Sequence, residues 1–254
     1  MSKSDPIKEN YDAAEDFDTY ANWVYNLAAL LSVVILLINR NEHPQAYDVV
    51  SIFFVLLVAA LFVMGIVQRL YLMPKAENSR LKDFFSKAYD VSLAAASTDG
   101  YYNSPFVEPI RRIASQTLEN SLFTSAIVRK MVFAERCKIA IYVAVWLTFV
   151  LTRQADIGLI AVATQAVFSE QILSRWFRVE WLRSRSSYVF DELFRSFQMD
   201  TGLAPFAATA MYLTSVYETA KANAGIILPT RLFEKLNPKL SQQWAEISAK
   251  ICKP

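Results

Sequence analysis

A segment rich in tyrosine and arginine holds the side chains best suited to binding a small ligand. Tyr101, Tyr102 and Asn103 lie in a turn-forming stretch, and Arg111 and Arg112 follow shortly after it. Tyrosine rings can stack on a nucleobase, and an arginine guanidinium can hold a phosphate at two points. These five residues form a candidate site for a small anionic nucleotide. The alternative is that the tyrosines pack against a membrane surface while the arginines face anionic lipid.

A second polar stretch, Glu119–Thr124 (ENSLFT), precedes a hydrophobic run. Its carboxylate, amide and hydroxyl groups are the kinds that satisfy the free backbone groups at a helix end. We expect them to cap and orient a helix. The alternative is that they line a site shared with the tyrosine-rich segment.

A third group combines basic and aromatic side chains directly after the last apolar run. Such a mixture is typical of the place where a helix leaves a bilayer, so we expect these residues to anchor the helix at the membrane surface. The group consists of Arg175, Trp176, Phe177, Arg178, Trp181, Arg183 and Arg185.

The chain lacks the residues that most catalytic mechanisms require. It has no glycine-rich phosphate loop, no zinc-type histidine pair and no nucleophile elbow. The single histidine, His43, lies beside Pro44 in an expected surface turn, and the two cysteines, Cys137 and Cys252, are far apart. We therefore predict no catalytic residue, no metal, no cofactor and no enzymatic activity. An enzyme built from Asp, Glu, Tyr and Ser alone is the alternative.

The elements that must position these residues are helices, some of them strongly apolar. The chain is 54% hydrophobic yet 20% charged, and Gly (5) and Pro (9) are few among its 254 residues. The apolar residues gather in four runs: Trp23–Ile38, Val49–Leu72, Ile139–Leu151 and Ile157–Phe168. The first two approach the ~20 residues that cross a ~30 Å hydrocarbon layer. The last two are shorter, so they fit either a second spanning hairpin or a half-inserted or protein-buried pair.

These runs predict an all-α membrane protein with two transmembrane helical hairpins and helical cytoplasmic segments. Basic residues gather beside the runs but are sparse in the links within each hairpin. The positive-inside rule therefore predicts that both termini lie in the cytoplasm. The acidic first residues do not resemble a cleavable signal peptide, so the first run is expected to remain as an inner-membrane anchor. A net charge of +2 gives no reason to expect nucleic-acid binding.

Four segments follow from this reading: a first hairpin segment, a cytoplasmic helical region, a second hairpin and a C-terminal cytoplasmic helical region. They cover residues 1–72, 73–132, 133–176 and 177–254. Apolar periodicity within the cytoplasmic regions predicts helices, the last of them starting near Asn237-Pro238. These helices cover 79–95, Val107–Ser115, Leu118–Phe133, Ile172–Met199, Leu203–Ala224 and Leu240–Ile251.

In its order of elements and in three stretches, the chain resembles the predicted four-transmembrane, pore-forming effectors of bacterial antiphage operons. Those effectors are encoded beside enzymes that make cyclic oligonucleotides. The stretches are DGYYNSPF (Asp99–Phe106), ENSLFTSAI (Glu119–Ile127) and YETAKANAGIILPTRLFEKLNPKLSQQWAEI (Tyr217–Ile247).

The resemblance implies an antiphage effector that senses a cyclic nucleotide made by a partner synthase, with a cyclic oligonucleotide as the possible ligand. Such a protein would form a homo-oligomer or open in the bilayer, disrupt the inner membrane and arrest or kill the infected cell. Two alternatives are a constitutive small channel, transporter or membrane scaffold that needs no nucleotide, and a membrane-bound enzyme.

Overall fold

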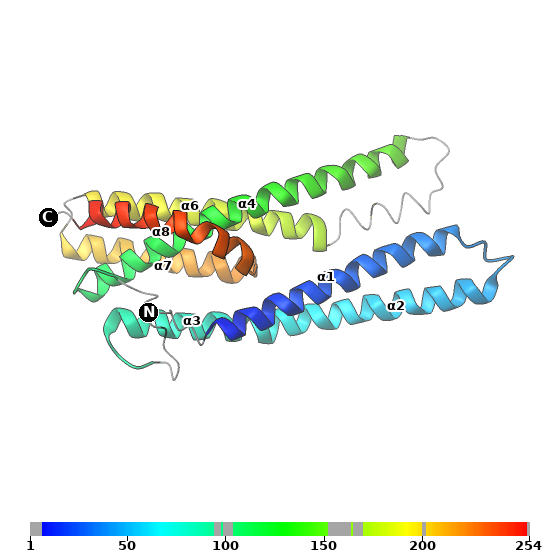
Figure 1. The fold of residues 1–254 in the computed structure, drawn as a ribbon, viewed down its shortest axis with the longest axis horizontal. Coiled ribbons are helices and arrows are strands. Elements are labelled where there is room, and N and C mark those ends of the chain that lie inside the picture. Colours follow the sequence, from blue (N-terminus) through cyan, green and yellow to red (C-terminus); the bar gives the residue numbers. More distant parts are fainter. Residues whose placement is uncertain are drawn as a thin grey trace. The chain divides into compact units, whose positions relative to one another are not determined.

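The computed structural model describes residues 7–93, 98, 104–151, 164, 170–199 and 202–252. All regular secondary structure among these residues is helical, which confirms the predicted all-α fold (Figure 1). In chain order the elements are α1 (Lys8–Leu37), α2 (Pro44–Val67), the π-helix η1 (Gln68–Leu72), α3 (Met73–Tyr89), α4 (Pro109–Leu151), the π-helix η2 (Glu170–Ser174), α6 (Arg175–Gln198), α7 (Leu203–Ala224) and α8 (Thr230–Ile251).

The chain divides into two compact units, and several helices contribute to both. One, which we call the bundle unit, comprises Met1–Ala13, Met73–Val132 and Arg178–Pro254. The other, the apolar unit, comprises Ala14–Leu72 and Phe133–Phe177.

In the apolar unit, α1 and α2 are joined by a tight polar turn. The Asn39 side-chain amide donates a hydrogen bond to Glu42 Oε1 (2.7 Å) within this turn. Pro44 then opens α2, where its fixed φ suits the first helical turn and its missing N–H costs no hydrogen bond. At the far end of α2, Gln68 Nε2 donates to the carbonyl oxygen of Ala14 in α1 (3.2 Å). The two helices therefore run antiparallel.

Helix α2 leaves its apolar side chains uncovered. Within the described residues, one helical segment, Pro44–Tyr89, contains a stretch long and apolar enough to cross a membrane, and none of that stretch is buried. The other predicted spans stay predictions, and the fourth run, apart from Thr164, lies outside the described residues. The exposed large apolar side chains of α2 are Val49, Ile52, Phe53, Val55, Leu56, Val58, Phe62, Val63 and Ile66.

A three-residue ionic cluster joins helices at the charged end of the apolar unit. The Arg175 guanidinium forms salt bridges with the carboxylates of Glu135 in α4 and Asp18 in α1, each at 3.2 Å. Farther along α4, the indole of Trp146 donates a hydrogen bond to the Thr164 hydroxyl (2.8 Å). The contacts to Glu135 and Trp146 therefore place Arg175 and Thr164 beside α4.

The bundle unit is built on four helices: the first part of α4 together with α6, α7 and α8 (Figure 1). Two apolar clusters fix their directions. Residues early in α4 and α7 pack with residues late in α6 and α8, whereas residues later in α4 and α7 pack with residues early in α6 and α8. Helices α4 and α7 are therefore parallel to each other and antiparallel to α6 and α8. The most buried leucines of these clusters are Leu118, Leu182, Leu193 and Leu213.

Two buried polar contacts set the register of α4 against α7. The hydroxyl oxygens of Thr117 and Thr214 lie 3.0 Å apart, and those of Thr124 and Tyr217 lie 2.7 Å apart. A buried hydroxyl without a partner costs about 1–3 kcal/mol, so sliding one helix along the other is strongly disfavoured.

Helix α3 covers the bundle and secures the segment that follows it. Phe84 packs beside Ile113 of α4 in a small apolar cluster. The buried Asp83 carboxylate accepts hydrogen bonds from the Thr98 backbone N–H (3.1 Å) and from the Thr98 hydroxyl. Helix α3 ends at Tyr89, where Asp90 adopts a left-handed conformation (φ 58°) that stops a helix.

Three sets of predicted helix boundaries are wrong. The helix expected over 79–95 begins at Met73 and ends at Tyr89. The helices expected at Val107–Ser115 and Leu118–Phe133 form one continuous helix, because the intervening Gln116 and Thr117 are buried in the core instead of forming a break. Asn237-Pro238 does not start the last helix. Helix α8 begins at Thr230 and continues through Pro238, because Phe233 and its apolar neighbours pack on the second cluster.

Candidate ligand-binding site

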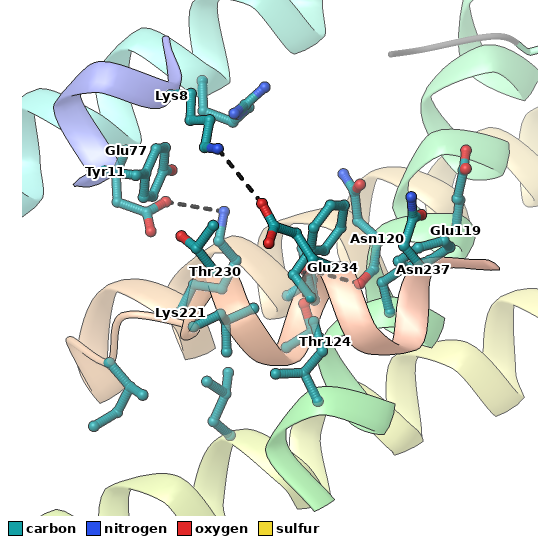
Figure 2. Close-up of a pocket in the computed structure, with 18 of the residues that line it drawn as sticks. Lys8, Tyr11, Glu77, Glu119, Asn120, Thr124, Lys221, Thr230, Glu234 and Asn237 are labelled. Atoms are coloured by element: carbon teal, nitrogen blue, oxygen red, sulfur yellow. Dashed lines mark hydrogen bonds and ion pairs between the residues drawn. The ribbon is translucent and has the colours of Figure 1, made fainter. Parts of the chain in front are cut away.

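A cavity of about 360 Å³ opens within the bundle unit. Helices α1, α3, α4, α7 and α8 provide most of its polar lining (Figure 2). The charged lining residues are Lys8, Asp12, Glu77, Arg80, Glu119, Lys221 and Glu234. The uncharged lining residues include Tyr11, Asn120, Phe123, Thr124, Tyr217, Phe233 and Asn237.

An ammonium group held by two carboxylates forms one side of the cavity. Lys221 Nζ lies 2.9 Å from Glu77 of α3 and 3.0 Å from Glu218 of α7, and all three side chains are less than a quarter exposed. Burial alone would lower the pKa of Lys221, but Glu218 and Glu77 outweigh it and hold that pKa well above its ordinary value. Lys221 is thus charged throughout the physiological range and ties α3 to α7.

Tyr11, from the first turn of α1, lies against this ionic group. The Arg80 guanidinium is 5.5 Å from the centre of the Tyr11 ring, within range of a cation–π interaction. Burial, reinforced by the Glu77 carboxylate, raises the pKa of the Tyr11 phenol far above its usual value. Tyr11 therefore stays neutral and offers the cavity a ring and a hydroxyl group.

Tyr217 and Thr124 form a buried wall of the cavity. The Tyr217 hydroxyl donates to the backbone carbonyl of Asn120 (3.2 Å) and lies 2.7 Å from the Thr124 hydroxyl oxygen. Burial raises the pKa of the Tyr217 phenol far above its ordinary value. This network fixes the stretch of α4 that faces the cavity.

The rest of the lining combines an ion pair, an apolar surface and amides. Lys8 of α1 and Glu234 of α8 form an exposed pair at 3.8 Å. The rings of Phe123 and Phe233 contact each other, with centroids 6.0 Å apart. In Figure 2, Glu119, Asn120 and Asn237 gather toward one side of the cavity, while Tyr11, Glu77 and Lys221 lie toward the other.

Of the predicted ligand residues, the structure describes Arg111 and Arg112, and neither lines this cavity. Tyr101, Tyr102 and Asn103 lie outside the described residues. Arg112 donates from Nε to the backbone carbonyl of Phe106 (2.8 Å), a contact that holds the start of α4. Arg111 pairs with Glu108 (3.4 Å) and lies 5.1 Å from the Phe206 ring centre. A ligand role for these five residues stays a prediction.

The stretch Glu119–Thr124 lies in the middle of α4, so the expected helix cap is wrong. The alternative holds in one respect: Glu119, Asn120, Phe123 and Thr124 line the cavity. Their mixture of polar and aromatic side chains in one helical turn was the sequence signal for this part of the site.

The basic and aromatic group at the start of α6 makes internal contacts. Arg183 pairs with Glu180 (2.8 Å), and the Arg185 guanidinium lies 4.3 Å from the Trp181 ring centre. Arg175 belongs to the ionic cluster of the apolar unit. Anchoring at a membrane surface stays a prediction for this group.

Several cavity residues were not predicted as site residues. Tyr11, Glu77, Lys221 and Asn237 come from four separate helices. Lys221 and Asn237 lie in the Tyr217–Ile247 stretch that carries the resemblance, but no pattern within a single helix marks any of the four as a ligand contact. Among the residues that the structure describes, no group of three or more His, Cys, Asp or Glu side chains could hold a metal ion. The chemistry available at this site is hydrogen bonding, ring stacking and ion pairing, which suits reversible binding of a small molecule.

No protein-family model, curated protein or solved structure matches this chain.

Proposed function

We propose that this chain is a membrane effector whose bundle unit senses a small cytoplasmic ligand and, on binding it, opens or oligomerises the membrane-embedded helices. The signal is a cyclic nucleotide made by a partner synthase, and the outcome is loss of the inner-membrane barrier and arrest or death of the cell. The protein acts as a homo-oligomer and catalyses no reaction.

Membrane insertion is supported by the exposed apolar surface of α2. Val55, Leu56 and Phe62 are each about 60–70% exposed, and the helix has no buried residue. Soluble proteins rarely expose a continuous apolar surface of this kind to water. Lipid tails cover such a surface without any loss of hydrogen bonds, because an α-helix satisfies its own backbone.

The observation that carries the proposal is that residues lining the cavity lie close in sequence to the points where the chain passes into the apolar unit. This closeness supports coupling between a bound ligand and the membrane helices. The chain passes between the two units at four points: after Ala13, Leu72, Val132 and Phe177. At each point the helix is continuous and a cavity-lining residue lies within about 10 Å along its axis. These lining residues are Asp12, Glu77, Ile127 and Leu182.

A ligand can shift an equilibrium only by binding one state better than the other. A molecule in this cavity would contact all four of the helices that continue into the apolar unit, so a rearrangement of these helices on binding is the proposed route to the membrane helices. The ion pairs Lys221–Glu77 and Lys8–Glu234 each join two different helices of the cavity wall, so a rearrangement of these helices would change them.

The test in cells is membrane depolarisation after induced expression of the full chain, with and without a co-expressed cyclic-nucleotide synthase. The proposal expects depolarisation only with the synthase. The same experiment with Leu56→Arg, which places a charge in the apolar helix, should abolish depolarisation. Depolarisation without the synthase indicates a constitutive channel and contradicts gating, and no depolarisation in either case contradicts the effector role.

A further inference from the structure

Helix α7 is uncharged on two opposite faces, and the bundle unit covers one of them. Phe206, Leu213 and Tyr217 point into the core and are 3%, 1% and 3% exposed. The opposite face is exposed, and we call it the α7 outer face. At about 100° per residue, its six side chains lie within an arc of about 100°. They are Ala204, Ala208, Met211, Tyr212, Ser215 and Thr219.

The α7 outer face carries no charge, unlike the exposed surfaces of its neighbours. The two charged residues of α7, Glu218 and Lys221, pair with each other beside the cavity. Exposed positions elsewhere in the bundle unit include Lys82 of α3, Arg195 of α6 and Lys239 of α8. A helix that is apolar all round is normally buried. The composition of α7 therefore indicates that another surface covers its outer face.

The charge of the α7 outer face restricts what that surface can be. Helices that lie on a bilayer have lysine and arginine beside their apolar side chains, and proteins that bind nucleic acid neutralise phosphates with the same two residues. The α7 outer face has neither residue. A strongly charged protein would also find no opposite charge there. The complement of this face is therefore another uncharged surface.

A second copy of the chain provides such a surface. Helix α7 runs parallel to the first part of α4, and α4 continues into the apolar unit. Two copies inserted in one bilayer have the same orientation, so their α7 helices point the same way when a two-fold axis relates them. Each residue near that axis meets its own counterpart. A charged residue there would face a like charge, and the α7 outer face contains no charged residue.

The individual side chains of the α7 outer face suit a helix-to-helix contact. Ala204, Ala208 and Ser215 are small, and small residues let two helix backbones approach closely. Ser215 Oγ donates to the backbone carbonyl of Met211 (2.9 Å), so its hydroxyl keeps a hydrogen bond when water is excluded. Met211 and Tyr212 are 40% and 60% exposed, and these larger side chains gain the most from burial.

The area of the face sets the strength of the contact. From Ala204 to Thr219 the face is about 23 Å long on a helix about 10–12 Å wide, which gives a contact on the order of 250 Å² on each copy. Stable complexes bury about 800 Å² on each partner. Pairing through this face alone is therefore weak and reversible, and it is favoured where copies are concentrated in one membrane. A chain that associates only on a signal needs a contact of this kind.

Building on the proposed function, which requires the chain to act as a homo-oligomer, we propose that the α7 outer face is the surface through which the bundle units of two copies pair. The two α7 helices are parallel. The two-fold axis that relates them passes beside Ala208, Met211 and Ser215.

The experiment is disulfide cross-linking in membranes of cells that express the full chain, with and without a co-expressed cyclic-nucleotide synthase. Ser215→Cys is introduced into a chain in which Cys137 and Cys252 are replaced by serine. Ser184→Cys, at an exposed position of α6, is the matched control. A disulfide requires Cα atoms about 4.4–6.8 Å apart, so Ser215→Cys should give at least tenfold more cross-linked dimer than Ser184→Cys in at least one of the two arms. Equal or absent cross-linking in both arms, or a Ser215→Cys product that is not twice the mass of the chain, overturns the inference.

A second pair of variants tests the chemistry of the contact. In the Ser215→Cys chain, Met211→Glu places two like charges beside the axis and should lower the dimer fraction at least fivefold. Tyr188→Glu, at an equally exposed position of α6 (40%), should leave the dimer fraction unchanged. Glutamate is a good helix former, and circular dichroism verifies that both variants keep their helices. Equal dimer fractions in the two variants contradict the assignment.

The inference and the proposed function fail in different ways. Cross-linking through Ser215→Cys without depolarisation of cells leaves the surface assigned and removes the effector role. Synthase-dependent depolarisation that persists in Met211→Glu, with no cross-linking through Ser215→Cys, supports the effector role and removes the present inference.

Discussion

Replacing Lys221 with methionine is the sharpest perturbation of the cavity. The ammonium lies within 3.0 Å of both Glu77 and Glu218, and the three side chains are 20–23% exposed. Methionine keeps most of the apolar stem but leaves two partly buried carboxylates facing each other. Removing one partner of a buried ion pair costs about 3–5 kcal/mol, and the residual exposure favours the lower end, about 3 kcal/mol.

The assay is thermal unfolding of the full chain in detergent, followed by circular dichroism. For a chain of this size, about 3 kcal/mol corresponds to a fall in Tm of about 6–12 °C. Lys235→Met, at an exposed position of α8, is the matched control and should shift Tm by less than about 2 °C. Adding Glu77→Gln to Lys221→Met removes one of the two unpaired charges and should recover part of the loss. A Lys221→Met protein that melts with the wild type refutes the assigned role of this ammonium.

Three further predictions concern charge, insertion and orientation. The raised pKa values of Lys221 and of the two cavity tyrosines mean that the folded chain holds these protons more tightly than the unfolded chain. The free energy of unfolding should therefore be unaffected by these groups between pH 7 and 9 and fall above about pH 10; a rise there in chemical denaturation experiments contradicts the sign. An arginine at the middle of a transmembrane helix costs about 2.5–3.5 kcal/mol. If α2 is inserted as proposed, Leu56→Arg should reduce the carbonate-resistant membrane fraction, whereas Val107→Arg in the bundle unit should not. Equal fractions would show that α2 is not in lipid. In a Cys137→Ser protein, Cys252 is the remaining cysteine and it is exposed. If the C-terminus is cytoplasmic, Cys252 should not react with a membrane-impermeant maleimide in spheroplasts and should react after lysis. Labelling before lysis would place the C-terminus outside.

Local signals predicted helices well where their ends are marked by glycine. Helix α7 runs from Leu203 to Ala224 as predicted, because Gly202 precedes it and Gly225 ends it in a left-handed conformation (φ 53°). The start of α8 could not be found in this way. Proline normally marks a helix start, but packing of Leu232 and Phe233 onto the second apolar cluster carries the helix through Pro238.

Tertiary contacts account for the rest of the difference between sequence and structure. Thr117 looked like part of a break in α4, yet its hydroxyl is buried against Thr214, 97 residues away. The cavity draws on segments scattered through the chain, and single-helix patterns do not reveal that Glu77 and Lys221 are partners. Glu119–Thr124 could be singled out as unusual, but its role as lining depends on the helices that face it.

The most direct test of the account is dye leakage from liposomes that contain the purified full chain. Cyclic mononucleotides and cyclic dinucleotides are added in separate titrations, with Asn237→Ala liposomes run beside the wild type. The account predicts no leakage without ligand and leakage with at least one of the cyclic nucleotides. Because Asn237→Ala removes an amide that lines the cavity, this variant should need about tenfold more ligand for the same leakage. Leakage without any ligand, or none with any cyclic nucleotide, contradicts a ligand-gated membrane effector.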